Sequence, residues 1–267
     1  MGTYIRLIDY DYAEKEKAFT KFDSKYVSSM KAYKNIPGCP FAYWIGLKTK
    51  QLFEEDTLHG KTMVRMGLTT GNNEYYLRYW YEVKVADVGF QKNRNSAMES
   101  KKKWFPYNKG GEYRKWYGNR EYVVNWYNDG YEMRTKLHPS GTRIWAHNFN
   151  LEYNFRKHIC WNDIVTKKIS FRAFEEGFLF DSAAAVSFVS EEDYFWLLGY
   201  LNCSIVDYLS KIINPTLHFK LGDFEKLPYL KCDELRISDM AQENVKISKE
   251  DWDSFESSWD FQRHPLI

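Results

Sequence analysis

Residues 103–126 read KWFPYNKGGEYRKWYGNREYVVNW, and this stretch combines aromatic side chains, cations and glycine turns at short intervals. The turn signals are Gly110-Gly111 and Gly118-Asn119, and they separate short aromatic and β-branched runs. Such runs are typical of strands, because these side chains pack well on a pleated sheet. The stretch therefore predicts short strands near Trp104, over 113–117 and over 122–126.

The remainder of the chain extends this mixed pattern. Further short strands are predicted over 64–68, 75–85, 159–165, 169–174, 178–180 and 217–221, and a loop over 91–102. The clearest helix covers 191–213, where leucine and isoleucine recur at helical spacing, and Asn202-Cys203-Ser204 divides it into two. The sequence therefore predicts an α+β fold with many short strands and a C-terminal helical segment.

Composition excludes several protein classes. The 267 residues are 44% hydrophobic and 28% charged, which fits one large or two small globular domains and not a disordered chain. No apolar run approaches the roughly 20 residues of a membrane span, and the N-terminus lacks the pattern of a secretory signal. The four cysteines are far apart, which favours a reduced cytoplasmic protein over a disulfide or zinc framework.

Charge is distributed unevenly along the chain. The formal net charge is +2, but residues 92–157 carry 14 Lys/Arg against 6 Asp/Glu, and residues 223–267 carry 6 against 11. In the basic region, cations suit phosphates and aromatic rings suit stacking on bases, which favours a nucleic-acid partner. The alternative is an aromatic β core whose lysines extend outward to solvent. Composition alone leaves both interpretations open.

Motifs for catalysis are sparse. An amino methyltransferase needs Asp/Asn-Pro-Pro-Tyr/Phe, and Asn214-Pro215-Thr216 lacks the second proline and the aromatic residue. Gly110-Gly111 precedes a strand pattern and fits a hairpin better than a phosphate-binding turn. Glu82-Val83-Lys84 and Glu99-Ser100-Lys101 have the spacing of a metal-dependent nuclease, but such triplets are also typical of solvated strand edges and loops.

Several longer blocks resemble one family in the same order along the chain. They are Ile36–Trp44 (IPGCPFAYW), Gly67–Asn73 (GLTTGNN), Arg78–Trp80 (RYW), Lys103–Trp126, Asn214–Asp223 (NPTLHFKLGD), Asp251–Phe255 (DWDSF) and Trp259–Phe261 (WDF). The sequence resembles the BREX-type adenine-specific DNA methyltransferases of bacterial phage defence, the PglX family, which are related to single-chain type II restriction–modification enzymes. The matched blocks span most of the chain.

This resemblance implies that the whole family member transfers a methyl group from S-adenosylmethionine to the exocyclic amine of adenine in duplex DNA. The matched region contains neither the cofactor motif nor the amine-holding motif, which are expected before Met1, and helical segments are expected after Ile267. Residues 1–230 are therefore expected to form a DNA target-recognition domain, with a boundary between two lobes near 90–100. Residues 231–267 are expected to form an acidic linker. The expected partners are double-stranded DNA and a catalytic domain, in cis or in trans, with no membrane and no cofactor in this chain.

The resemblance also places candidate DNA contacts. Thr69, Thr70, Asn72 and Asn73 carry short hydrogen-bonding groups suited to phosphates or base edges, although a plain turn would also use Gly and Asn here. The full expected set is Thr69, Thr70, Asn72, Asn73, Arg78, Lys103, Tyr107, Asn108, Lys109, Arg114, Lys115, Trp116, His218 and Lys220. The alternatives are a protein-interaction domain that docks other defence-complex subunits and a metal-dependent nuclease.

Overall fold

A computed structural model describes residues 1–21, 25–29, 33–166, 168–264 and 266–267 of the chain. The α-helices are α1 (Tyr12–Lys21), α2 (Leu47–Leu52), α3 (Asn73–Tyr76), α4 (Arg94–Ser100), α5 (Tyr127–Thr135), α6 (Tyr194–Leu201), α7 (Ser204–Ile213), α8 (Leu221–Glu225) and α9 (Glu234–Asp253). The strands are β1 (Gly2–Ile5), β2 (Lys25–Ser28), β3 (Met63–Arg65), β4 (Leu77–Tyr79), β5 (Trp104–Asn108), β6 (Tyr122–Asn125), β7 (His158–Asn162), β8 (Phe171–Phe174), β9 (Leu179–Phe180) and β10 (Ala184–Phe188). The predicted α+β class is confirmed.

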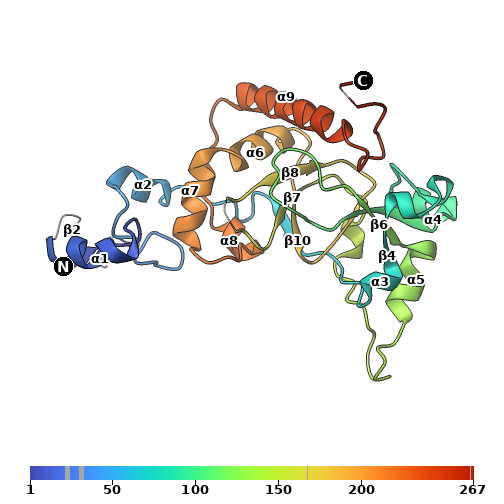
Figure 1. The fold of residues 1–267 in the computed structure, drawn as a ribbon, viewed down its shortest axis with the longest axis horizontal. Helices are drawn as coiled ribbons and strands as arrows, with labels where there is room; N and C mark the ends of the chain where they lie inside the picture. The colour runs from blue at the N-terminus through green and yellow to red at the C-terminus, as the bar shows by residue number, and fades with distance from the viewer. Residues whose placement is uncertain (22–24, 30–32, 167, 265) are drawn as a thin grey trace.

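Two four-stranded sheets organise the molecule. The central sheet has the order β3-β10-β7-β8 and is antiparallel throughout, with Val186 opposite both Arg65 and Cys160. The second sheet has the order β4-β6-β5-β9, in which only β5 and β9 run parallel. A separate β1-β2 pair lies with α1 and α2 at one end of the molecule, and α3, α4 and α5 lie at the other end with the second sheet (Figure 1).

The largest core lies between the central sheet and the helices that follow it. Trp161 of β7 stacks on Phe224 of α8 with ring centroids 4.5 Å apart, and Leu209 of α7 is fully buried. α6 is apolar on nearly every side, because the central sheet contacts one face and α9 covers another (Figure 1). Burial of this apolar surface is the main stabilising contribution to the fold.

The C-terminal segment packs against both sheets. Arg114 pairs with Asp251 of α9 at 3.0 Å, and its guanidinium lies 5.1 Å from the Trp252 ring centroid. The Trp80 indole donates a hydrogen bond to the Ser257 carbonyl at 2.8 Å, and Trp259 packs on aromatic rings at the second sheet. Within the described ranges, the structure has no helix that is both long and apolar enough to cross a bilayer.

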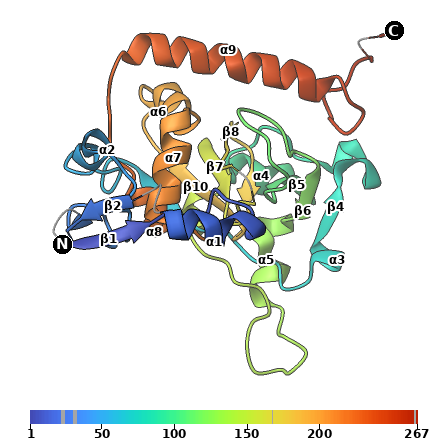
Figure 2. The same ribbon diagram turned by 60° about the vertical axis from the view of Figure 1, so that its left-hand side comes forward.

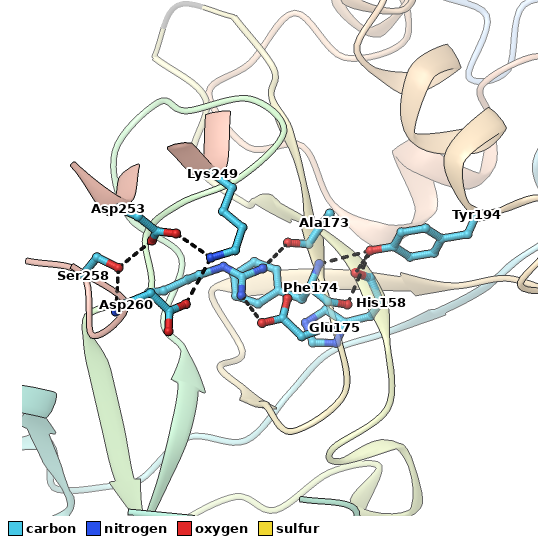
Figure 3. A network of polar contacts seen from close by, with 10 residues as sticks. His158, Ala173, Phe174, Glu175, Tyr194, Lys249, Asp253, Ser258 and Asp260 are labelled. Carbon is cyan, nitrogen blue, oxygen red and sulfur yellow. Dashed lines mark hydrogen bonds and ion pairs between the residues drawn. The ribbon is translucent and has the colours of Figure 1, made fainter. Parts of the chain in front are cut away.

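A buried arginine connects this segment to the core. Arg120 is 1% exposed, pairs with Glu175, donates to the Ala173 carbonyl at 2.8 Å, and stacks 3.7 Å above the Tyr117 ring. Figure 3 shows the neighbouring contacts, in which Lys249 of α9 bonds to Asp253 and Asp260. Tyr194 of α6 bonds to the backbone of His158 and Phe174 in the same region.

The helical prediction over 191–213 is confirmed, including its division at 202–204. Asn202 explains the division, because its side chain exchanges two hydrogen bonds with the backbone of Phe171, at 3.1 and 2.9 Å. These bonds satisfy the backbone N–H and carbonyl of Phe171 in β8, and they hold Asn202 at the position where α6 ends. The predicted strands near Trp104, 122–126, 159–165, 169–174 and 178–180 are also present, as β5 to β9.

Three predicted elements were wrong. Residues 91–102 contain α4 and not only a loop, because the Asn93 side chain accepts a hydrogen bond from the Ser96 N–H at 2.9 Å and caps the helix. Residues 113–117 form a loop with only an isolated bridge from Trp116 to Arg172. Residues 217–220 contribute only the bridge between Ile164 and His218, after which α8 begins.

Candidate nucleic-acid interface

Backbone hydrogen bonds join three distant segments at one side of the two sheets. The Leu68 N–H donates to the Phe180 carbonyl at 3.0 Å, and the Ser182 N–H donates to the Leu68 carbonyl at 3.0 Å. Thr69 and His147 exchange two backbone bonds, at 2.8 and 3.0 Å. The turn 67–73 is therefore fixed between the β9–β10 connection and residues 145–149.

The same pattern continues to the ends of β5 and β7. The Asp181 N–H donates to the Asn108 carbonyl at 2.9 Å, and the Asp163 N–H donates to the Ala183 carbonyl at 3.2 Å. The Phe219 N–H in turn donates to the Asp163 carbonyl at 2.7 Å. We call this surface the loop face, and it comprises residues 66–73, 109–111, 145–150, 162–164, 181–183 and 217–220.

Two glycines fix the turn 67–73 closely against its neighbours. A Cβ atom at Gly67 would lie 1.9 Å from the Phe180 carbonyl oxygen, so a larger residue requires the backbone to move. Gly71 has a φ of +73°, and a Cβ there would meet the Trp145 ring at 2.6 Å. Only glycine satisfies both the left-handed backbone and the close approach.

The polar residues of this turn are partly engaged in local structure. The Thr70 hydroxyl, which is buried, donates to Asn73 Oδ1 at 2.6 Å. Asn72 Oδ1 accepts from the Tyr75 N–H at 3.1 Å and caps α3. Each amide oxygen keeps a second lone pair, and neither amide nitrogen has a hydrogen-bond partner among the described residues. The turn thus presents two donors on a fixed backbone.

Strand β5 contributes two buried residues, and the position directly after it contributes one surface residue. Lys109 reaches the loop face, where its ammonium pairs with Asp181. Tyr107 is fully buried and donates to Asp181 at 2.8 Å, and burial raises the pKa of its phenol, which therefore stays protonated. Asn108 is also fully buried, with its amide 3.1 Å from His158 Nε2. The side chains of Tyr107 and Asn108 therefore lie beneath the loop face and do not reach its surface in this structure.

Residues 114–116 lie away from the loop face and hold the fold together. Arg114 contacts α9, as described above. Lys115 donates to the Asn202 carbonyl at 2.6 Å, and burial lowers the pKa of its ammonium. Trp116 is half-buried against the main core, and its N–H donates to the Phe171 carbonyl at 2.9 Å. In this structure residues 114–116 thus make contacts within the protein, and their expected contact with DNA stays a prediction.

Two further expected cations gather around Trp104. The Arg78 guanidinium lies 5.9 Å from the Trp104 ring centroid, and Lys103 Nζ lies 5.2 Å from it. Arg78 also donates to the carbonyls of Glu74 and Leu77, at 2.5 and 2.6 Å. These two cations therefore belong to the second sheet and not to the loop face.

The segment after α7 supplies the last two expected residues. His218 Nδ1 lies 3.1 Å from an Asp163 carboxylate oxygen, and the His218 side chain is 53% exposed. The Lys220 N–H donates to Asp223 Oδ2 at 3.2 Å, and its side chain is exposed. The loop face thus brings together Thr69, Asn72, Asn73, Lys109, His218 and Lys220 from the expected set.

Sequence reasoning missed the part of the loop face that follows α5. His147 and Phe149 stack in parallel there with ring centroids 5.8 Å apart, and Asn150 donates to the Met66 carbonyl at 2.8 Å. The available signal was the run 133–151, which contains Arg134, Lys136, Arg143 and two histidines but no Asp or Glu. A long acid-free run with several cations is typical of a polyanion contact.

Two features of the described residues bear on cofactor and metal chemistry, namely the glycines after β5 and the arrangement of acidic side chains. Gly110 and Gly111 follow β5, but the chain then runs to β6 through a loop and not into a helix. These residues therefore do not fit the glycine-rich strand-to-helix turn that cradles a nucleotide cofactor. In the part of the chain that the structure describes, no group of three His, Cys, Asp or Glu side chains has the geometry of a metal site. Glu82 instead accepts a bond from the Tyr79 N–H at 2.7 Å.

Comparison with known proteins finds similar individual proteins, although no family model matches the chain. The chain is 35% identical over 277 aligned positions to the adenine-specific methyltransferase PglX of Lacticaseibacillus casei (strain Zhang), covering 100% of this chain and 23% of that protein. It is 35% identical over 238 positions to the adenine-specific methyltransferase BrxX of Escherichia coli O9:H4 (strain HS), covering 88% of this chain and 18% of that protein. The chain therefore spans about a quarter or less of the length of these relatives. The family resemblance predicted from the sequence is confirmed, and this chain corresponds over its whole length to one region of the PglX-type adenine-specific methyltransferases.

Proposed function

We propose that this chain recognises the DNA target for an adenine-specific methyltransferase of a bacterial phage-defence system. The observation that carries the proposal is the match of the entire chain to a region that makes up only 23% of PglX. The loop face supports it, because short polar side chains stand there on a rigid backbone frame. Catalysis would belong to a separate domain, in cis or in trans, that binds S-adenosylmethionine.

The chemistry of the loop face suits base reading more than dense phosphate binding. Adenine offers one acceptor and one donor in the major groove, and an asparagine amide matches both. Asn72 and Asn73 present free amide nitrogens beside the exposed edge of the turn. Lys220 is exposed at the other end of the face, where a cation suits the flanking phosphates, and the exposed ring of His218 lies near it.

The expected cytoplasmic location belongs to the same proposal. All four cysteines are free in the structure, and Cys160 is buried, where burial raises the pKa of its thiol. A protonated buried thiol is stable in a reducing compartment and is chemically inert. Chromosomal and phage DNA are both found in the bacterial cytoplasm, so the proposed DNA partner agrees with this location.

The test uses a substitution that separates base reading from turn formation. Asn72→Asp keeps the oxygen that caps α3, because Asp and Asn cap helices about equally well, but it removes the amide donor. In the full-length enzyme, we expect Asn72→Asp to change which sites are methylated, as read by methylome sequencing, while the melting temperature of the domain is preserved. Asn72→Ser is the matched control, because serine also caps the helix and also lacks the amide donor but adds no negative charge.

Two results would contradict the proposal. One is an unchanged methylated motif in both variants at normal expression. The other is the absence of salt-sensitive duplex binding by the 267-residue chain, since docking of other defence subunits does not release DNA counterions.

A further inference from the structure

A hairpin projects from the molecule directly after α5. Figures 1 and 2 show the chain leaving α5 and extending away from both sheets, on the opposite side from α9. The His138 N–H donates to the Arg143 carbonyl at 2.8 Å, and the Trp145 N–H donates to the Lys136 carbonyl at 2.9 Å. Residues 136–145 thus form a hairpin loop with a single β-bridge between Leu137 and Ile144, which we call the projecting hairpin.

The tip of the projecting hairpin is ordered by its own side chains. The Ser140 N–H donates to His138 Nδ1 at 3.1 Å, and the Ser140 and Thr142 hydroxyls lie 2.9 Å apart. The Gly141 N–H closes the turn on the His138 carbonyl at 2.7 Å. A segment that is ordered before binding loses less conformational entropy on binding, which favours a recognition role for an exposed loop.

The base of the hairpin is fixed to the turn 67–73. Trp145 packs on Gly71, and the next residues bond to Thr69. Lys136 Nζ lies 3.8 Å from the ring centroid of Tyr75, which belongs to α3, the helix that Asn72 caps. The hairpin and the two asparagines of the loop face are therefore held in one rigid arrangement.

The surface of the hairpin suits a negatively charged groove with apolar walls. The run 133–151 contains no acidic residue. Arg143 is exposed, and its guanidinium has no partner among the residues that the structure describes. Leu137 and Ile144 are 56% and 45% exposed on the stem, where they are available to sugars or thymine methyl groups.

We propose that the projecting hairpin enters the major groove of the duplex beside the turn 67–73, with Arg143 as a DNA contact. The major groove is wide enough for a two-stranded ribbon, whereas the minor groove of undistorted DNA is about half as wide. The inference rests on the proposed function, because it needs DNA as the partner, and it adds a second reading element to the loop face.

The first test measures duplex binding by the 267-residue chain with labelled DNA and fluorescence anisotropy. Loss of one phosphate contact weakens binding about eightfold at roughly 0.1 M salt and makes the slope of log affinity against log salt shallower by about 0.9. We expect Arg143→Ala to show this loss. Arg236→Ala is the matched control, because Arg236 is an exposed arginine on α9, at the opposite side of the molecule.

A second measurement shows directly whether the projecting hairpin occupies the major groove. Dimethyl sulfate modifies guanine N7 in the major groove, so a hairpin inserted there protects guanines in the bound duplex. We expect protection with the unsubstituted chain and its loss when residues 139–142 are replaced by a two-residue Asn-Gly turn. No salt-sensitive binding by the unsubstituted chain would overturn both proposals. Normal binding by Arg143→Ala, with unchanged guanine protection in the shortened variant, would overturn only the hairpin proposal.

Discussion

Acidification should destabilise this protein through one residue, His158, which is completely buried at the start of β7. Its Nδ1 donates to the Arg156 carbonyl at 2.8 Å, and its Nε2 accepts from the Asn108 amide at 3.1 Å. The ring stacks on Phe174 with centroids 5.1 Å apart. Burial lowers the pKa of His158 from 6.5 to about 4, with the nearby charge of Arg120 acting in the same direction.

The sign and size of the effect follow from this pKa difference. The folded chain holds His158 neutral, whereas the unfolded chain protonates it below pH 6.5. The stabilising contribution is therefore complete above pH 6.5 and is lost as the pH falls toward 4. One pKa unit corresponds to about 1.4 kcal/mol, so the free energy of unfolding drops by about 2 kcal/mol at pH 5 and about 3 kcal/mol below pH 4 from this group alone.

The assay compares urea unfolding at about pH 7 and about pH 5 in the natural chain and in His158→Gln. We expect the natural chain to lose about 2 kcal/mol more than the variant between these two conditions, because other titrating groups cancel in the difference. NMR titration of the His158 ring in the natural chain gives the pKa without any substitution. Parallel pH profiles in the two chains, or a ring that titrates near 6.5, would refute the reasoning.

Three other perturbations test different parts of the structure. Arg114→Ala should lower the free energy of unfolding in urea by about 1 kcal/mol, because the ion pair with Asp251 and the contact with Trp252 are lost. The same variant should leave the salt slope of DNA binding, measured by anisotropy, unchanged. Gly67→Ala should destabilise the chain by about 1–3 kcal/mol, because its Cβ displaces the Phe180 carbonyl, and hydrogen exchange at Leu68 should rise in step. The 267-residue chain should transfer no methyl group from labelled S-adenosylmethionine to adenine-containing duplexes, and turnover above a buffer control would contradict the division of labour proposed here.

Regular periodicity made part of this fold predictable from the sequence. α6 and α7 follow from apolar spacing together with the interruption at Asn202, and the strands of residues 104–125 follow from aromatic and β-branched runs between glycine turns. α4 was missed because its seven residues are mostly polar and too few to show a helical period, and the capping signal of Asn93 was the main local indication of a helix. Short polar helices are decided by caps more than by periodicity.

The roles of the cations were not predictable, because they depend on contacts between distant segments. Arg114 and Asp251 are 137 positions apart, and nothing local to residues 103–126 shows that α9 will cover them. Lys115 likewise meets the Asn202 carbonyl, 87 positions away. Conversely, the turn geometry of 67–73 is visible in the sequence, since glycine and asparagine need only local geometry to be recognised.

The charge distribution now has a different meaning from the one that composition suggests. Of the 14 Lys/Arg in residues 92–157, seven form ion pairs with Asp or Glu, namely Arg94, Lys109, Arg114, Arg120, Arg134, Lys136 and Lys157. About half of the excess charge is therefore balanced within the fold, because four of these pairs use carboxylates outside residues 92–157. The cations left for DNA on the loop face and the projecting hairpin are chiefly Lys220 and Arg143. Two or three phosphate contacts predict a salt slope of about −2 to −3 for the isolated chain, since each contact contributes about −0.9. Anisotropy titrations across a salt series measure this slope. A slope steeper than about −5 would show that cations paired in this structure exchange their carboxylate partners for phosphates on binding.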